Sequence, residues 1–124
     1  MTVTLFTNFK LLDTDSGSLN SGYQVLISGN LIADVSSQDI SCPGAQTIDL
    51  GGRTLMPGLI DCHNHISREI LAGPPSMLPS LGTARSATVL YDMLMRGFTT
   101  LRDAAGADLG HKQAVEEGHS YEDD

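Results

Sequence analysis

The sequence predicts an α/β protein with a β-rich first half and a second half in which strands alternate with helices. Two observations carry this prediction. Up to Pro57, short apolar runs alternate with segments rich in Gly, Asn, Asp and Ser, which is typical of strands and turns. Beyond Pro57, apolar positions with the 3.6-residue period of a helix lie between two β-type runs. A strand, a crossover helix and a second strand form a parallel, right-handed unit.

The first half is expected to form strands near Val3–Leu11, at 23–28, at 31–36 and within 47–57. Gly29-Asn30 separates two of these runs and predicts a two-residue hairpin turn, because glycine adopts positive φ readily. Gly51-Gly52 predicts a second turn. Residues 13–22 and 36–46 are expected to form loops, because their composition favours turns.

Beyond Pro57 the sequence predicts a strand at 58–61, a helix from Thr83 to about Arg96, a strand at 98–103 and a short helix before Gly118. Thr83 and Asp108 are the expected N-caps, and Gly97 is the expected left-handed residue that ends the first helix. The expected buried face of that helix consists of Ala87, Leu90, Tyr91 and Leu94. Residues 67–83 are expected to form a long loop, and the acidic tail 119–124 is expected to be disordered.

Charge and composition exclude several classes of function. The chain of 124 residues has 15 acidic and 7 basic residues and a net charge of -8, which disfavours nucleic acid and anionic membranes as partners. No apolar run approaches the roughly 20 residues of a membrane span. The N-terminus has no signal-peptide pattern, and Cys42 and Cys62 make no disulfide framework. We therefore expect a cytoplasmic protein without a nucleic-acid or membrane partner.

The strongest chemical motif is His63-Asn64-His65, which directly follows the strand predicted at 58–61. Residues two apart in extended backbone point to the same side, so both imidazoles should project together. Two neutral imidazoles that face one point are half of a zinc-type site. In parallel α/β folds, functional sites lie at the carboxyl ends of strands. The motif therefore predicts a metal site, against the alternative of two histidines that fall together by chance in a loop.

Three further polar residues lie at the same predicted edge, and each has two interpretations. Asp61 either orients an imidazole by a hydrogen bond to the ring or caps the end of the strand. Arg102 and Asp103 end the second strand, where they either contribute to the site or make a local ion pair or loop hydrogen bond.

The remaining candidates are weaker. Cys62 alternates away from the histidines and is expected to be a small buried residue. His111, on a short exposed helix, and His119, in the tail, are minor candidates for metal ligands. Met77, Met93 and Met95 are expected to be packing residues.

Two segments of the sequence resemble the amidohydrolase superfamily of metal-dependent hydrolases. LMPGLIDCHNHI, residues 55–66, matches its P-G-h-I-D-x-H-x-H signature, where h is apolar, and RGFTTLRDAAGA, residues 96–107, resembles its second barrel strand. The G-[FV]-T-T-h-R-D pattern is most similar to the imidazolonepropionase and Xaa-Pro dipeptidase-like branch. Asp49-Leu50-Gly51-Gly52 resembles the end of the small β-sandwich that precedes the barrel.

The resemblance implies a division of the chain into three parts. Residues 1–56 would form the N-terminal part of a composite β-sandwich, and residues 57–118 the first two β/α units of a (β/α)₈ TIM barrel. The acidic tail 119–124 would follow. The barrel would be incomplete, because a whole one needs roughly 200 residues or more.

The resemblance also implies a chemistry. His63 and His65 would bind a divalent metal, zinc by expectation, whose bound water attacks a C–N bond of a small amide, cyclic amide or dipeptide. The other ligands of the family come from later strands, so we expect the isolated chain to be inactive. We also expect the incomplete fold to self-associate. The alternative function is a small non-catalytic binding or interaction module derived from the same fold.

Overall fold

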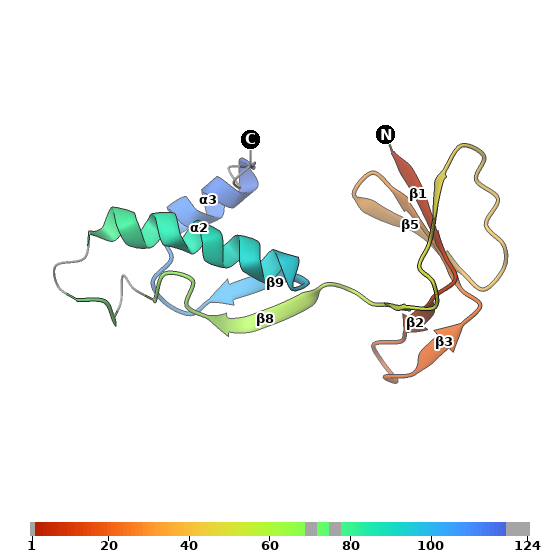
Figure 1. Ribbon diagram of the computed structural model, residues 1–124, viewed down its shortest axis with the longest axis horizontal. Coiled ribbons are helices and arrows are strands. Elements are labelled where there is room, and N and C mark those ends of the chain that lie inside the picture. The colour runs from red at the N-terminus through yellow and green to blue at the C-terminus, as the bar shows by residue number, and fades with distance from the viewer. Residues whose placement is uncertain (1, 69–71, 75–77, 119–124) are drawn as a thin grey trace. The chain divides into compact units, whose positions relative to one another are not determined.

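The computed structural model describes residues 2–68, 72–74 and 78–118. It divides into two compact units, Met1–Pro57 and Gly58–Asp124, which Figure 1 shows in red to yellow and in green to blue. Among the described residues, no helix is both long enough and apolar enough to cross a membrane.

The first unit consists of two small β-sheets. The larger sheet has the strand order β5-β4-β1-β6 and the smaller has the order β3-β2-β7. The strands are β1 (Val3–Thr7), β2 (Lys10–Leu12), β3 (Leu19–Ser21), β4 (Gln24–Ser28), β5 (Leu31–Ser36), β6 (Gln46–Asp49) and β7 (Thr54–Leu55). The predicted hairpin is confirmed, because β4 and β5 pair antiparallel around Gly29, whose φ is 60°. The turn at Gly51-Gly52, both with positive φ, is confirmed as well.

The connection between β1 and β2 takes the chain from one sheet to the other. Asn8 has a φ of 53°, in the left-handed region that asparagine tolerates better than most residues. Its side chain donates a hydrogen bond to Asp49 Oδ1 at 2.7 Å, and its carbonyl accepts one from Gly52 N at 2.8 Å. Phe9 follows and is buried, as is Val25 on β4. Phe9 and Val25 are therefore the buried hydrophobic residues among those that the structure describes in the first unit.

The prediction that residues 13–22 form a loop is wrong at its end. Asp13 accepts hydrogen bonds from the backbone N–H groups of Asp15 and Ser16, which closes a turn. The chain then returns as β3 beside β2, with Leu19 opposite Leu12. A strand of three mostly polar residues cannot be recognised from the sequence of a turn-rich segment, because it is defined only by its pairing with β2.

The second unit has the order β8 (Leu59–Asn64), α2 (Pro79–Met95), β9 (Phe98–Asp103) and α3 (Leu109–Glu116). β8 and β9 pair in parallel, and α2, which connects them, packs against β9 (Figure 1). The predicted strand–helix–strand unit is therefore confirmed. β8 continues past the predicted end of the strand and includes His63.

The prediction that Thr83 caps the long helix is wrong. The helix begins at Pro79, with Leu78 at the N-cap position and no side-chain cap. Proline is favoured in the first turn, since its fixed φ suits the helix and its missing N–H has no partner there. The Thr83 hydroxyl instead donates to Pro79 O at 3.1 Å. The predicted loop 67–83 is therefore shorter than expected, and part of it (69–71 and 75–77) lies outside the described residues.

The predicted buried face of α2 is only half right. Ala87 and Leu90 are partly buried, but Tyr91 and Leu94 are 47% and 55% exposed. The buried positions are instead Gly82, Ser86 and Met93. The buried face was predicted from the spacing of apolar residues, and that criterion does not select glycine or serine. Small residues such as these are buried where a helix packs closely against its neighbours. Met93 packs as expected, Met95 is exposed, and Met77 lies outside the described residues.

The predicted ends of the helices are confirmed. Gly97 follows α2 with a φ of 93°, and Gly118 follows α3 with a φ of 75°. Asp108 caps α3 by accepting hydrogen bonds from Gly110 N and His111 N. The tail 119–124, which we expect to be disordered, lies outside the described residues.

We predict that Gly58→Ala destabilises the second unit by about 1–3 kcal/mol, the usual cost of overpacking. A Cβ at Gly58 would lie 2.7 Å from Thr99 Cβ on β9, closer than two carbons can approach. Rotation of the threonine side chain cannot relieve that contact, so the strands must shift. Denaturant unfolding of the variant measures the cost. The matched control is the same substitution in a Thr99→Gly background, where the cost should largely disappear; an equal cost in both backgrounds contradicts the prediction.

Candidate metal centre

The histidine pair lies at the carboxyl end of β8. His63 belongs to the strand and His65 directly follows it. Because β8 and β9 are parallel, their carboxyl ends meet at one edge, where Asn64 is paired with Asp103. The segment that follows β9 therefore lies beside the histidines, as the sequence predicted for this edge.

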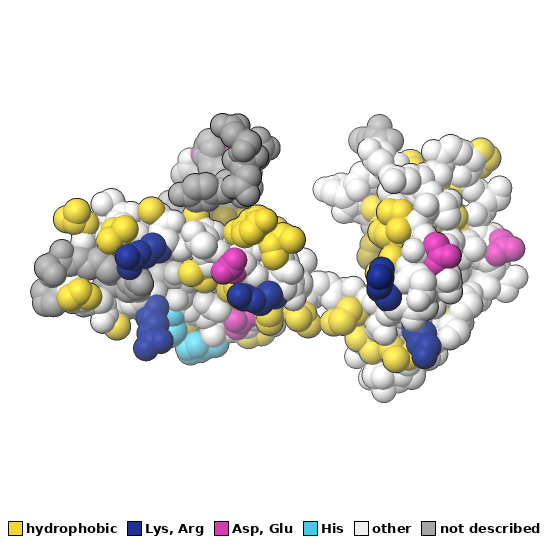
Figure 2. Space-filling view, viewed as in Figure 1, with side chains coloured by type: hydrophobic (Ala, Val, Ile, Leu, Met, Phe, Trp, Pro, Cys, Tyr) yellow, Lys and Arg dark blue, Asp and Glu magenta, His cyan; other side chains and the backbone are white. Residues whose placement is uncertain are grey.

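The two imidazole rings lie side by side, edge to face, as expected for residues two apart that point to the same side. Their centroids are 5.2 Å apart, with an interplanar angle of 83°, and both histidines are exposed. Histidine side chains also reach the visible surface of the second unit in Figure 2. Zinc–nitrogen bonds of about 2.0–2.1 Å and tetrahedral angles put the ring centroids of two histidines on one ion about 5 Å apart. The observed separation fits two ligands of one ion.

A backbone hydrogen bond orients His65. Its Nδ1 lies 3.0 Å from Ala105 O. A carbonyl oxygen only accepts, so this contact selects the tautomer with the proton on Nδ1. The lone pair is then on Nε2, and metal-binding histidines are commonly held in this way by the ring nitrogen that does not bind.

Asp103 makes loop hydrogen bonds, as one of its two interpretations proposed. Its Oδ2 accepts from Ile66 N at 2.8 Å, and its Oδ1 accepts from Ala107 N at 3.2 Å. One carboxylate therefore ties the residue after His65 to the loop after β9. Its neighbour Arg102 is exposed.

Asp61 caps the end of the strand rather than orienting a ring. Its carboxylate accepts hydrogen bonds from the Asn64 side chain at 2.7 Å and from His63 N at 3.1 Å. The Asn64 amide, and then the His63 N–H, hold the pKa of Asp61 below its ordinary value. The carboxylate thus stays charged beside the histidine pair.

Two expectations about neighbouring side chains are wrong. Cys62 is exposed rather than buried, and Ile60, two residues earlier on the same strand, is 64% exposed as well, so this face of β8 is open. The side chain of His111 is only 9% exposed, although its helix was expected to leave it in solvent. It reaches Ser67, a buried residue for which the sequence pattern predicts no role. His119 lies outside the described residues.

The described residues fit a metal ion only in part. Among them, no three His, Cys, Asp or Glu side chains come together as a ligand group. A catalytic zinc ion has three protein ligands and a water, and a structural one has four. His63 and His65 supply two ligands, and no catalytic step through a metal can be derived from this part of the chain alone.

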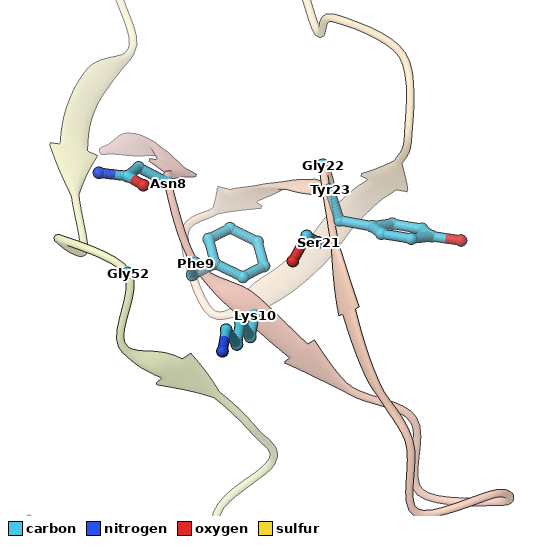
Figure 3. A pocket seen from close by; sticks show the side chains of 7 residues that line it. All are labelled: Asn8, Phe9, Lys10, Ser21, Gly22, Tyr23 and Gly52. Carbon is cyan, nitrogen blue, oxygen red and sulfur yellow. The ribbon is translucent and has the colours of Figure 1, made fainter.

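A hollow of about 360 Å³ in the first unit offers no competing site. It is lined by Asn8, Phe9, Lys10, Ser21, Gly22, Tyr23 and Gly52. In Figure 3 the Tyr23 side chain points away from the others, and the Phe9 ring occupies the middle of the group. The polar groups of this hollow do not converge on one point, as those of a binding site do.

Comparisons with known proteins agree with the signature. The chain matches no protein-family model. It is 36% identical over 87 residues to the adenine deaminase of Serratia proteamaculans, and 37% identical over 67 residues to that of Escherichia coli O9:H4. These matches cover 70% and 54% of this chain but only 14% and 11% of the enzymes.

The solved structures cover almost the whole chain. An amidohydrolase superposes with a TM-score of 0.88 at 42% identity, over 96% of this chain and 29% of its own. A prolidase in complex with N-methylphosphonate-L-proline gives 0.83 at 37% identity, over 97% and 30%. A Xaa-Pro dipeptidase with bound methionine gives 0.80 at 26% identity, over 95% and 31%. The chain thus spans less than a third of these structures, and the resemblance stated from the signature is confirmed.

Proposed function

Because this chain shares the fold and sequence of the N-terminal part of the amidohydrolase superfamily, we propose that it supplies the first metal ligands of such an enzyme. The reaction proposed is metal-dependent hydrolysis of a C–N bond in a small amide, cyclic amide or dipeptide. His63 and His65 are the proposed ligands, and zinc is the proposed metal. Residues 57–118 are the proposed first two β/α units of a TIM barrel, preceded by the composite β-sandwich part at 1–56.

The observation that carries the proposal is the geometry of the histidine pair. Two exposed rings with centroids 5.2 Å apart match two ligands of one tetrahedral ion. The Nδ1 contact of His65 with Ala105 O leaves Nε2 as the ligand atom. Such a pair at the carboxyl end of a parallel strand lies where α/β enzymes place their sites.

The chemistry follows from what these residues do. A bound divalent metal lowers the pKa of its water toward about 7 and polarises the carbonyl that is attacked. In this chain, His63 and His65 would hold the ion, and the Ala105 carbonyl fixes the ring of His65. Asp61 stays ionised through its hydrogen bonds to Asn64 and His63 N and adds negative charge near the cation.

The proposed substrate class rests on the relatives. The solved neighbours include a prolidase and a Xaa-Pro dipeptidase, and dipeptides with a C-terminal proline are therefore the first substrates to test. The curated relatives named adenine deaminase widen the class to other C–N bonds. Cytoplasmic location stays a prediction.

The alternative is a non-catalytic binding module. The observation in its favour is that the described residues bring together two metal ligands rather than three or four. A module of this kind would fold cooperatively as a monomer and would bind a ligand without turnover.

We predict that specific zinc binding is lost when His63→Ala and His65→Ala are combined. Two imidazoles supply only part of a coordination shell, so the affinity of the unaltered chain should be modest. Zinc titration by calorimetry measures it. Cys62→Ser is the control for the exposed neighbouring thiol and should leave the affinity unchanged. Equal zinc affinity of the double variant and the unaltered chain would remove the site.

We predict that the 124-residue chain by itself does not hydrolyse dipeptides or cyclic amides at an ordinary enzyme rate, on the order of 1 per second or more. Two ligands neither complete a catalytic zinc site nor position a substrate. Product release in the presence of added zinc measures the rate. Turnover at enzymatic rates that disappears with the double histidine variant would show that the site is completed in another way.

We predict that the chain associates with a second copy of itself, increasingly as salt rises. Ile32 is 69% exposed on β5, an edge strand of the larger sheet, and edge strands pair readily with other chains. The net charge of -8 opposes association, and salt screens this repulsion beyond about 8 Å. Light scattering across a salt series measures the mass.

Ile32→Lys places a charge on the edge strand and should reduce this association. Ser37→Lys, just beyond the strand, adds the same charge without blocking the edge and is the matched control. A monodisperse monomer at every salt concentration would contradict self-association and would favour the binding module.

A further inference from the structure

We propose that His111 is a positioning residue for the histidine pair, which it serves by binding Ser67 and so fixing the backbone that carries His65. This inference rests on the proposed function, because it concerns the geometry of the same site. It adds a residue from α3, far along the chain from the signature, to the groups that the site needs.

The first step is that residues 103–105, at the end of β9 and just beyond it, bind residues 64–66 one by one. Ala104 N donates to Asn64 O at 2.8 Å. The Ala105 carbonyl lies 3.0 Å from His65 Nδ1, and the Asp103 carboxylate accepts from Ile66 N at 2.8 Å.

His111 makes the fourth of these contacts. Its Nε2 lies 3.0 Å from Ser67 Oγ. Residues 64, 65, 66 and 67 are therefore each bound by a group between Asp103 and His111. The contact with Ser67 is the last of the series, and it fixes the point at which the chain leaves the site.

The second step is that His111 is itself held in place. Its Nδ1 lies 3.0 Å from Asp108 Oδ1 and accepts a hydrogen bond from Asp108 N at 3.3 Å. Together with the Asp108 side chain, which accepts from His111 N, these contacts form the capping box of α3. They hold the ring with Nε2 at 3.0 Å from Ser67 Oγ. The hydrogen bond from His111 lowers the pKa of Asp108, so that carboxylate stays charged.

The order Asp108–His111–Ser67 also has the connectivity of a nucleophilic triad, in which an acid orients a histidine and the histidine binds a serine. Burial argues against that function. Ser67 is 1% exposed, so a substrate carbonyl cannot approach its hydroxyl. A buried hydroxyl needs a partner, and His111 satisfies it. The chain of contacts therefore holds the backbone rather than attacking a substrate.

Two substitutions at His111 separate positioning from helix capping. Asparagine reaches about as far as Nδ1, so His111→Asn keeps the contact with Asp108 and loses the one with Ser67. Glutamine reaches about as far as Nε2, so His111→Gln keeps the contact with Ser67. We expect His111→Asn to weaken zinc binding about tenfold, which is a common effect of removing a group that orients a metal ligand. We expect His111→Gln to retain the zinc affinity of the unaltered chain within about threefold.

Ser67→Ala gives an independent test if the asparagine variant folds poorly. It should weaken zinc binding as much as His111→Asn does, and the two together should cause no further loss, because both remove one contact. Zinc affinity equal to that of the unaltered chain in both single variants would overturn the proposal. Weaker zinc binding in His111→Gln but not in His111→Asn would overturn it too, since loss of the contact with Asp108 alone would then explain the effect.

A metal-free measurement separates this proposal from the proposed function. Nitrogen NMR of the imidazoles reports which ring atom of His65 carries the proton. We expect the Nδ1–H form in the unaltered chain and in His111→Gln, and a mixture of tautomers in His111→Asn. If the unaltered chain binds no zinc, the metal site fails but the ring state still tests the positioning. An unchanged ring state in His111→Asn overturns the positioning itself.

Discussion

The parallel pairing of β8 with β9 is the constraint on which the candidate site depends. It brings the end of one strand, Asn64, opposite the end of the other, Asp103. Without that register, the loop after β9 could not reach the residues that follow the strand. The hydrogen bonds between residues 103–105 and residues 64–66 are therefore a consequence of the strand pairing and of the crossover helix α2, which makes a parallel arrangement possible.

The pattern of residues was enough to predict the local elements and the histidine pair. Two-residue spacing predicts that His63 and His65 share a side, and the ring contact confirms it. Turn and cap chemistry identified Gly29, Gly97 and Asp108, because a positive φ or a capping carboxylate is a property of the residue itself.

Three of the failures share a physical cause, since each depended on a tertiary partner. The short strand β3 exists only because β2 lies beside it. Ser86 is buried by the packing of α2 in the second unit, although the apolar pattern predicts Tyr91 and Leu94 as buried residues. His111 looked like a surface residue of a polar helix, and only the position of Ser67 turns it inward. A histidine three residues after a capping aspartate was the available signal for its contact with Asp108, but nothing local predicts the contact with Ser67.

The two segments that carry the family resemblance are also the two that bind each other. Residues 55–66 hold the histidine pair, and residues 96–107 contain Asp103 and Ala105, which bind Ile66 and His65 across 37 and 40 positions of sequence. A motif of two histidines is therefore not a self-contained site. Its backbone groups leave the strand ladder at Asn64 and need other partners, because buried backbone groups without hydrogen bonds are costly. The later segment provides those partners, and in doing so it fixes the ring on which any metal chemistry would depend.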